Sequence, residues 1–312
     1  MAFPGSRRVM LFAAFLACVA SPLSAQIQDQ LSAYTGRNGE SYLAPLANAF
    51  GADLNAGIFR SASIPRTGFA IKLEIQVMSV IFKDENRTFK AVPERGFTPL
   101  PGETSFDAPT VVGSEKAVIV EGAGGTSYAF PGGFNLNSFA LAVPQLRIGA
   151  YGTEAVVRYF AIKAGDTELG DIGLFGIGVR HSISQLLPGK IPLDVSGGFF
   201  WQQFRLGKNK QGGDLIKANA LSIGVQASKR FLRVLVPYGG LTYDTASIDV
   251  HYQSEVTGTG VNVDIDHSSP STMHLTVGLL LDLPILSVYG EYGVANQNTF
   301  AFGFGLGFGI GL

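Results

Sequence analysis

Acid–base chemistry in this sequence would begin with its four histidines, which are His181, His251, His267 and His274. A hydrolase needs a nucleophile beside a histidine that a carboxylate orients, and no serine stands in a strained elbow motif. In a β-strand His274 would share a face with Thr276 and Asp282, and this pattern favours a polar residue inside a barrel over a catalytic pairing. We therefore predict no catalytic residue, and we expect that the protein is not an enzyme.

A second concentration of imidazoles and carboxylates lies toward the C-terminal end of the chain. It contains Asp249, His251, Asp264, Asp266 and His267. Such groups hold divalent cations, but the spacing matches neither a zinc motif nor a calcium-binding loop. We interpret the surrounding segment, Ser247–Thr272, as a solvated outer loop, and we predict neither a metal site nor a cofactor.

A third set consists of charged residues that would point into a barrel lumen. The lumen-facing candidates are Lys72, Glu74, Arg147, Glu154, Arg158, Arg180, Asp282 and Glu291. Four are basic and four are acidic, so no single sign predicts ion selectivity. They could line a polar conduit or form ion pairs that fill a narrow barrel, and we favour the filled interior because few strands enclose little more than side chains.

The elements that would position these residues are strands of alternating polarity. In Thr299–Leu312 bulky apolar residues alternate with glycine and alanine, so one face has almost no side chains. In Thr67–Phe82 one face is apolar, and the other carries Lys72, Glu74 and Gln76. Lipid on one side and a crowded or polar interior on the other would produce both patterns.

Ten segments of this kind lie between turn signals. They are Thr67–Phe82, Phe139–Ala150, Thr153–Lys163, Glu168–His181, Leu193–Leu206, Leu215–Lys229, Phe231–Val250, Met273–Leu283, Ile285–Val294 and Thr299–Leu312. Short turns alternate with longer loops along the chain, as in outer-membrane barrels. Closure would remove the unpaired strand edges that lipid cannot satisfy.

The predicted fold is therefore all-β, an antiparallel transmembrane β-barrel of ten strands over residues 66–312. A hairpin that includes Ala117–Glu121 would raise the number of strands to twelve. The competing interpretation is a soluble periplasmic barrel or sandwich, in which the apolar faces would meet in a common core.

The N-terminal 25 residues have the pattern of a secretory signal peptide, with Arg7 and Arg8 before a 12-residue apolar run. The only cysteine, Cys18, lies in this segment, so an exported chain would have no thiol chemistry. We expect cleavage of residues 1–25 and export to the bacterial outer membrane. A formal charge of −1 and 46% hydrophobic residues exclude a basic nucleic-acid binder and a disordered chain.

Residues 26–65 follow a helical pattern, because apolar residues recur there at spacings of three and four. The positions that we expect to contact a barrel wall are Tyr42, Leu46, Phe50 and Leu54. The segment could be a plug in the lumen, a periplasmic amphipathic helix or a partner-binding segment, and we favour the plug. Glycines weaken a strand, so the C-terminal strand could also mark a lateral opening.

The run from Tyr42 to Phe59 (YLAPLANAFGADLNAGIF) resembles the N-terminal motif of a family of bacterial outer-membrane β-barrel proteins of unknown function. Other motifs that carry the resemblance are Pro144–Leu146, Arg158–Phe160, Gly170–Ile183, Val236–Tyr243 and the GFGIG run of the last segment. The resemblance implies a fold and a location, and it implies no activity. Leu312 departs from the family, in which a terminal aromatic residue is common.

These features predict a plugged barrel that binds or passes a small apolar or amphipathic compound, because the lumen is narrow, aromatic residues are many and no charged eyelet is evident. The alternative is a structural or surface-interaction protein that works through its two long loops, residues 84–137 and 247–272. The expected partners are outer-membrane lipid, the barrel-assembly machinery through the C-terminal strand, and a small apolar ligand. Nucleic acid is not expected.

Overall fold

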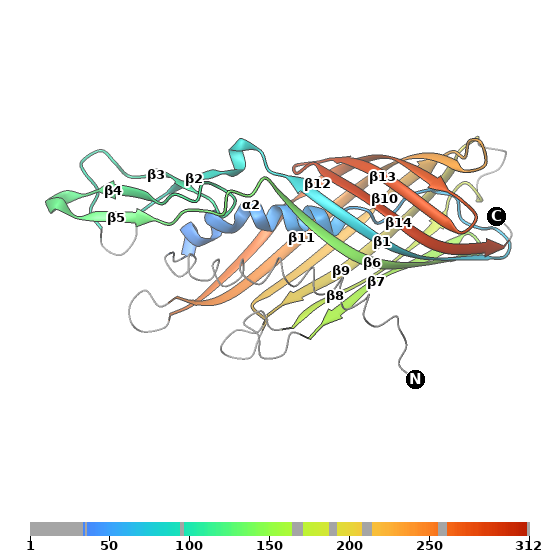
Figure 1. Ribbon diagram of the computed structural model, residues 1–312, viewed down its shortest axis with the longest axis horizontal. Helices are drawn as coiled ribbons and strands as arrows, with labels where there is room; N and C mark the ends of the chain where they lie inside the picture. The colour runs from blue at the N-terminus through green and yellow to red at the C-terminus, as the bar shows by residue number, and fades with distance from the viewer. Residues whose placement is uncertain are drawn as a thin grey trace.

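The computed structural model of this chain describes residues 34, 36–93, 97–163, 171–186, 192–207, 214–254 and 261–310. The predicted signal peptide and Leu312 lie outside the described residues. Antiparallel strands form a closed barrel in which neighbours in the sequence are neighbours in the wall (Figure 1). The wall strands are β1 (Phe69–Ile81), β6 (Ser138–Ala150), β7 (Thr153–Ile162), β8 (Ile172–Ser182), β9 (Asp194–Leu206), β10 (Ile216–Ser228), β11 (Leu235–Ser254), β12 (Val261–Asp282), β13 (Leu286–Val294) and β14 (Thr299–Ile310). The predicted ten-stranded barrel is confirmed.

The barrel closes between its first and last strands. β14 pairs with β1 continuously, from Val80 opposite Thr299 to Phe69 opposite Ile310. The other edge of β14 pairs with β13. The backbone pairing along these strands leaves no gap, so the lateral opening considered for the C-terminal strand is absent from this part of the wall.

Glycine on the inner face of β14 makes room for long side chains of β1. A Cβ atom at Gly305 would lie 2.5 Å from Cγ of Glu74, and one at Gly307 would lie 2.6 Å from Cγ of Lys72. Both distances are too short for a side chain at either position. The alternation of phenylalanine and glycine in β14 therefore has two causes. The phenylalanines are large apolar residues on the lipid-facing side, and the glycines leave space on the inner side for charged side chains of β1.

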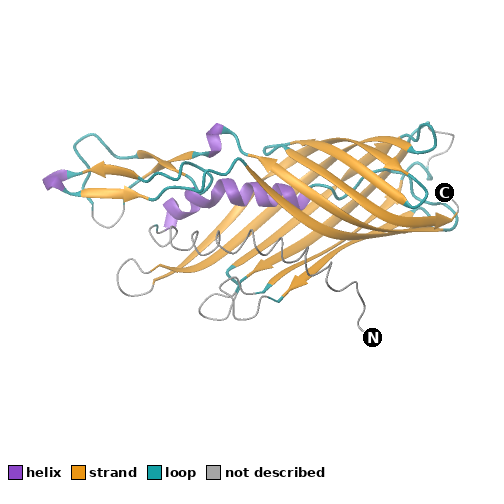
Figure 2. Ribbon diagram, in the orientation of Figure 1, coloured by secondary structure: helices purple, strands orange, loops and turns teal. Residues whose placement is uncertain are grey.

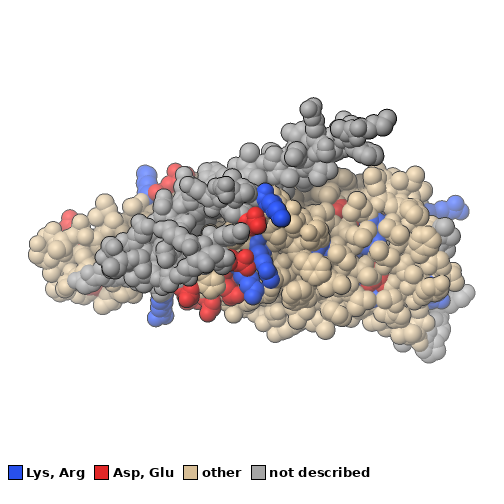
Figure 3. All heavy atoms as spheres, turned by 90° about the horizontal axis from the view of Figure 1, so that it is seen from below, with Lys and Arg blue, Asp and Glu red and all other residues tan. Residues whose placement is uncertain are grey.

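The outer face of the barrel is an apolar belt. Its exposed side chains include Phe175, Ile177, Leu221, Ile223, Val225, Leu275, Val277, Leu279, Phe300, Phe302, Phe304, Leu306 and Phe308. Charged side chains are sparse over the barrel surface seen in Figure 3 and gather toward its ends. Exposed apolar surface on this scale is a liability in water, and it matches the lipid-facing band of a transmembrane barrel.

Replacing Phe304 by arginine tests this belt, because Phe304 lies in the middle of β14 with 54% of its surface exposed. We expect the variant to lose about 2–4 kcal/mol of folding free energy in a bilayer, the cost of arginine near the midplane of a barrel. Refolding into lipid vesicles, followed by the heat-dependent gel mobility of folded barrels, measures the loss. Phe304→Leu is the control, and equal stability of the arginine variant would contradict a lipid-facing position.

The two ends of the barrel differ in the length of their connections. At the end that we call the short-turn end, Tyr151–Gly152 joins β6 to β7, and residues 283–285 join β12 to β13. At the opposite loop end, the described residues 82–93 and 97–137 form an extension that projects beyond the wall (Figures 1 and 2). It contains η1 (Asp84–Asn86), β2 (Thr88–Ala91), β3 (Phe106–Pro109), β4 (Val118–Glu121), η2 (Ala123–Gly125) and β5 (Ser127–Phe130).

The extension holds two separate two-stranded sheets, β2 with β3 and β4 with β5. The predicted hairpin at Ala117–Glu121 exists, but it does not join the barrel wall. The twelve-stranded alternative is therefore wrong.

The predicted outer loop Ser247–Thr272 is also wrong in part. β11 continues to Ser254 and β12 begins at Val261, so most of this segment is a paired strand extension. A register shift between Asp244 and Ala246 separates the extension from the barrel pairing. The buried apolar residues of this extension, Ile248, Val250 and Ile265, alternate with polar residues, so mean hydropathy alone does not distinguish it from a loop.

Candidate functional site

Helix α2 (Gly36–Asn55) enters the barrel from the loop end (Figures 1 and 2). It contacts β1, β6, β10, β11 and β12. Tyr42 and Leu54 are fully buried, and Leu46 and Phe50 pack against the same core. The ring of Phe50 lies 4.8 Å from that of Phe204 and 5.7 Å from that of Phe139, measured between centroids. The structure thus places all four plug candidates against the wall or the loop-end extension.

Polar contacts and one close approach fix the opposite side of the helix to β11 and β12. Asn55 donates from Nδ2 to the carbonyl of Thr245 at 3.1 Å, and Asn48 Oδ1 is 2.9 Å from Nε2 of His267. At Gly51 an added Cβ would lie 2.7 Å from Cβ of Ala246. Glycine at this position therefore lets the helix backbone approach the wall directly.

After the helix, residues 56–65 run through the lumen as a linker. Carbonyl groups of the last turn of α2 and of this linker accept hydrogen bonds from wall arginines. Arg158 donates from Nη1 to Leu54 O at 2.9 Å and from Nη2 to Ala56 O at 2.8 Å. Arg147 donates to Ile58 O at 2.7 Å, and Arg180 donates to the carbonyl of Arg60 at 3.4 Å. We call these four alternate carbonyls and three arginines the carbonyl ladder, and residues 36–65 the plug segment.

Arg158 is the most deeply buried arginine of the ladder, with no exposed surface. Its remaining hydrogen bonds go to Oε1 of Gln145 at 2.8 Å and Oε1 of Gln76 at 3.2 Å, and its guanidinium carbon lies 5.3 Å from the centroid of the Phe200 ring. Gln202 donates to the Leu54 carbonyl as well. A buried guanidinium is tolerated when its donors are satisfied, and here backbone and amide oxygens of the plug segment and wall accept them.

Glu291 accepts a hydrogen bond from the turn that joins α2 to the linker. Its Oε1 accepts from the backbone N–H of Gly57 at 2.9 Å, and its Oε2 accepts from the hydroxyl of Tyr238 at 2.7 Å. Gly57 has a φ of 65°, and an added Cβ would lie 2.7 Å from Oε1 of Gln76. The chain therefore leaves the helix through a left-handed residue, as helix C-termini commonly do.

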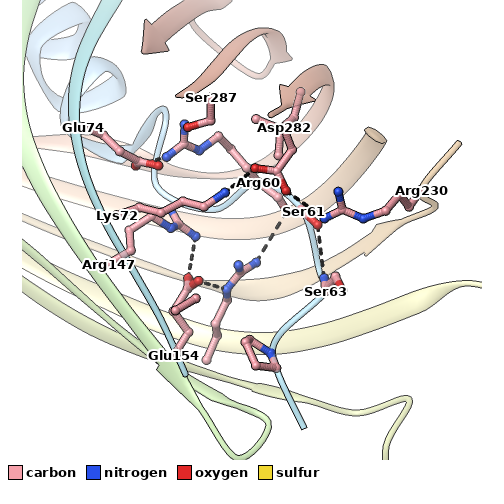
Figure 4. Close-up of a pocket in the computed structure, with 14 residues that line it drawn as sticks. Arg60, Ser61, Ser63, Lys72, Glu74, Arg147, Glu154, Arg230, Asp282 and Ser287 are labelled. Atoms are coloured by element: carbon pink, nitrogen blue, oxygen red, sulfur yellow. Dashed lines mark hydrogen bonds and ion pairs between the residues drawn. The ribbon is translucent and has the colours of Figure 1, made fainter. Parts of the chain in front are cut away.

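At the short-turn end the linker and wall enclose a charged pocket with a volume of about 50 Å³ (Figure 4). Six of the lumen-facing candidates meet here or at its edge. They are Lys72, Glu74, Arg147, Glu154, Arg180 and Asp282. The other two, Arg158 and Glu291, contact the plug segment deeper in the lumen. The structure therefore brings these predicted residues together on the inner side of one barrel.

His274 has different neighbours from those expected from the sequence. Its Nδ1 lies 2.8 Å from Oδ2 of Asp244, and its Nε2 lies 3.3 Å from Oγ1 of Thr299. Asp282 instead pairs with Lys72 and Arg230. The order hydroxyl, imidazole, carboxylate matches a catalytic triad, but all three side chains are buried. Neither the charged pocket nor a second cavity of about 20 Å³ is lined by any of them.

Asp53 is the unusual group of the plug segment. It lies in the last turn of α2 with no exposed surface, and both carboxylate oxygens lack a hydrogen-bond partner. Burial raises the pKa of Asp53 well above its usual range. A carboxylate at the C-terminal end of a helix is also at the unfavourable end of the helix dipole. No motif or spacing in the sequence marks Asp53 as a functional residue.

The carboxylate and imidazole concentration considered for a metal lies in the extended strands. His251 Nδ1 is 2.8 Å from Oδ1 of Asp264, whereas His267 contacts the helix. Among the residues that the structure describes, no three or more histidine, cysteine or acidic side chains gather as a metal site would require. Within the same residues, no helix has the length and hydropathy to cross a membrane.

A family model described as a family of unknown function (DUF6588) matches residues 6–308. The chain belongs to this family. The prediction of membership in a family without known activity is thus confirmed. None of the curated proteins compared with the chain matches it.

Solved structures similar to this chain are barrels with little sequence identity. The attachment invasion locus protein Ail of Yersinia pestis has 10% identity and a TM-score of 0.25, over 78% of this chain and 99% of Ail. A loop-deletion mutant of OmpT, an outer membrane protein of Vibrio cholerae, has 11% identity and a TM-score of 0.27, over 77% and 98% of the two chains. The translocator domain of the autotransporter NalP from Neisseria meningitidis has 11% identity and a TM-score of 0.30, over 83% and 92%.

Proposed function

We propose that this chain is a bacterial outer-membrane β-barrel that binds or passes a small apolar or amphipathic compound when its plug segment moves. Lipid surrounds the apolar belt, the C-terminal strand is the contact for barrel assembly, and the protein acts without catalysing a reaction. Export would follow cleavage of the signal peptide at residues 1–25.

The observation that carries this proposal is the polarity of the inner wall near the loop end. Porin-like barrels have polar interiors, whereas helix α2 here packs against apolar wall residues. Those in the same buried cluster include Leu141, Phe139, Leu174, Phe204, Ile248 and Ile265. If α2 moved away, these side chains would line an apolar chamber with the charged pocket beneath it. Such a chamber suits a ligand whose surface is largely hydrocarbon.

A disulfide that ties α2 to the wall tests the proposal. The Cβ position of Gly51 lies 3.9 Å from Cβ of Ser269, within the range that a disulfide needs. The variant combines Gly51→Cys and Ser269→Cys with Ala246→Gly, which removes the closest neighbouring atom, and with Cys18→Ser. We expect oxidation to abolish uptake of the hydrophobic dye N-phenyl-1-naphthylamine into vesicles that contain the protein, and dithiothreitol to restore it.

The matched control carries Gly51→Ser instead of Gly51→Cys, so it has the same crowding at the helix and cannot form the bridge. It should take up dye equally under oxidising and reducing conditions. Equal uptake by the bridged and reduced forms would show that α2 need not move, and the transport proposal would then fail.

The second candidate function is a structural or surface-interaction role. The observation in its favour is the extension of residues 82–137, which projects past the wall and exposes apolar side chains such as Ile119 and Leu100. A barrel without dye uptake in either redox state would favour this role. Loss of surface binding after replacement of β4 and β5 by a short glycine–serine linker would then support it.

A further inference from the structure

The charged pocket at the short-turn end carries more positive than negative charge. Its basic side chains are Arg60, Lys72, Arg147, Arg180 and Arg230. Its acidic side chains are Glu74, Glu154 and Asp282. Five cations against three anions leave an excess of two positive charges in a partly enclosed space. Uncompensated charge away from water is costly, so the pocket favours a negatively charged occupant.

The excess arises because two carboxylates each serve two cations. Glu154 Oε1 accepts from Arg147 Nη2 at 2.5 Å and from Arg180 Nε at 2.8 Å. Both arginines are almost fully buried. One carboxylate cannot neutralise two guanidinium groups, so this group of three keeps one positive charge.

The second shared carboxylate lies across the pocket. Asp282 pairs with Lys72 through Oδ1 and with Arg230 through Oδ2, the latter at 2.8 Å. Figure 4 shows Lys72 and Arg230 on opposite sides of this carboxylate. Lys72 comes from β1, whereas Arg230 comes from the turn between β10 and β11. This group also keeps one positive charge, at the more exposed edge of the pocket.

The guanidinium group of Arg60 provides a second observation, independent of the charge excess, that favours an oxyanion in the pocket. It comes from the linker, is 3% exposed, and is paired with Glu74 through Nη2. Its Nη1 is buried and has no hydrogen-bond partner. Buried donors are nearly always satisfied, and an oxygen atom in the pocket would satisfy this one.

We propose that this pocket binds one small oxyanion group, a phosphate or a carboxylate, between Arg60 and the two three-residue clusters, each of which has a net charge of +1. A volume of about 50 Å³ suits a single group of this size. Several guanidinium groups suit the geometry of phosphate and carboxylate oxygens. The proposal does not depend on transport, because binding can be measured without it.

The test is calorimetric titration of the full chain, in a nonionic detergent at low ionic strength, with inorganic phosphate and with acetate. Arg230→Gln removes one positive charge and leaves Asp282 paired with Lys72. We expect saturable binding by the wild type and about tenfold weaker binding by the variant, the loss of about 1.4 kcal/mol. The matched control is Arg233→Asn, which removes a charge from the same turn outside the pocket lining.

The control should bind phosphate as the wild type does. Absence of saturable binding by the wild type, an unchanged affinity in Arg230→Gln, or equal losses in both variants would overturn the proposal. A parallel titration with short-chain phosphatidic acid separates the sources of the phosphate group. Tighter binding of the lipid would identify a headgroup as the occupant, whereas tighter binding of inorganic phosphate would identify a free anion, and both results support the site.

Discussion

Replacing Arg158 by alanine should release the plug segment while the barrel stays closed. The variant removes the donors to Leu54 O and Ala56 O and leaves a cavity beside Phe200. Two lost charge-assisted hydrogen bonds and a buried cavity cost on the order of 3–5 kcal/mol. We expect higher conductance in planar bilayers and faster dye uptake, together with protease cleavage within residues 56–65.

Two further variants give this prediction its controls. Arg158→Lys keeps the charge but has no planar fork to bridge two carbonyls, so its effect should be intermediate. Arg205→Ala removes a half-exposed arginine of β9 that donates to no carbonyl of the plug segment. The wall itself is followed by heat-dependent gel mobility, which should remain that of a folded barrel. If conductance and cleavage of Arg158→Ala matched the wild type, the carbonyl ladder would not hold the plug segment.

The barrel could be predicted from the sequence because lipid and lumen impose opposite demands on alternate residues. In β14 Phe304 faces outward and Gly305 faces the side chain of Glu74, so the period of two is explicit in the sequence. The inward positions of Lys72 and Arg158 follow from the same period. The long pairing of β11 with β12 does not, since its outer face is polar rather than lipid-facing and its inner face, with Ile248 and Ile265, packs in the core that contains α2.

The connections within the lumen could not be predicted in the same way. The carbonyl ladder uses backbone oxygens, which every residue has, so no residue type marks Leu54 or Ala56 as an acceptor. Arg60 lies in the linker, where no strand period indicates its direction. The contact of His274 with Asp244 depends on the register of β11 against β12, and that register shifts at Asp244 itself. Side-chain alternation assigns a face to each residue but does not assign its partner across strands.

Replacing Asp53 by asparagine should have the opposite effect to Arg158→Ala, because it should hold the plug segment more firmly in the barrel. At neutral pH the wild-type helix either keeps a buried carboxylate without a partner or keeps that group protonated at a cost. An isolated buried charge costs several kcal/mol, and movement of α2 into water would relieve this cost. Asp53→Asn removes the charge with almost no change in shape, so we expect at least about tenfold slower dye uptake at pH 7, a change of about 1.4 kcal/mol between two states.

The pH dependence has a definite sign. Burial raises the pKa of Asp53 in the closed arrangement above that of the exposed group. Below the ordinary pKa both arrangements are protonated and no penalty exists, whereas the closed arrangement loses stability as pH rises through the raised pKa. Uptake by the wild type should therefore increase with pH above about 4, and uptake by Asp53→Asn should not follow that increase. Asp266→Asn, at an exposed carboxylate of β12, should keep the wild-type profile. Identical profiles for Asp53→Asn and the wild type would mean that this carboxylate does not oppose the closed plug.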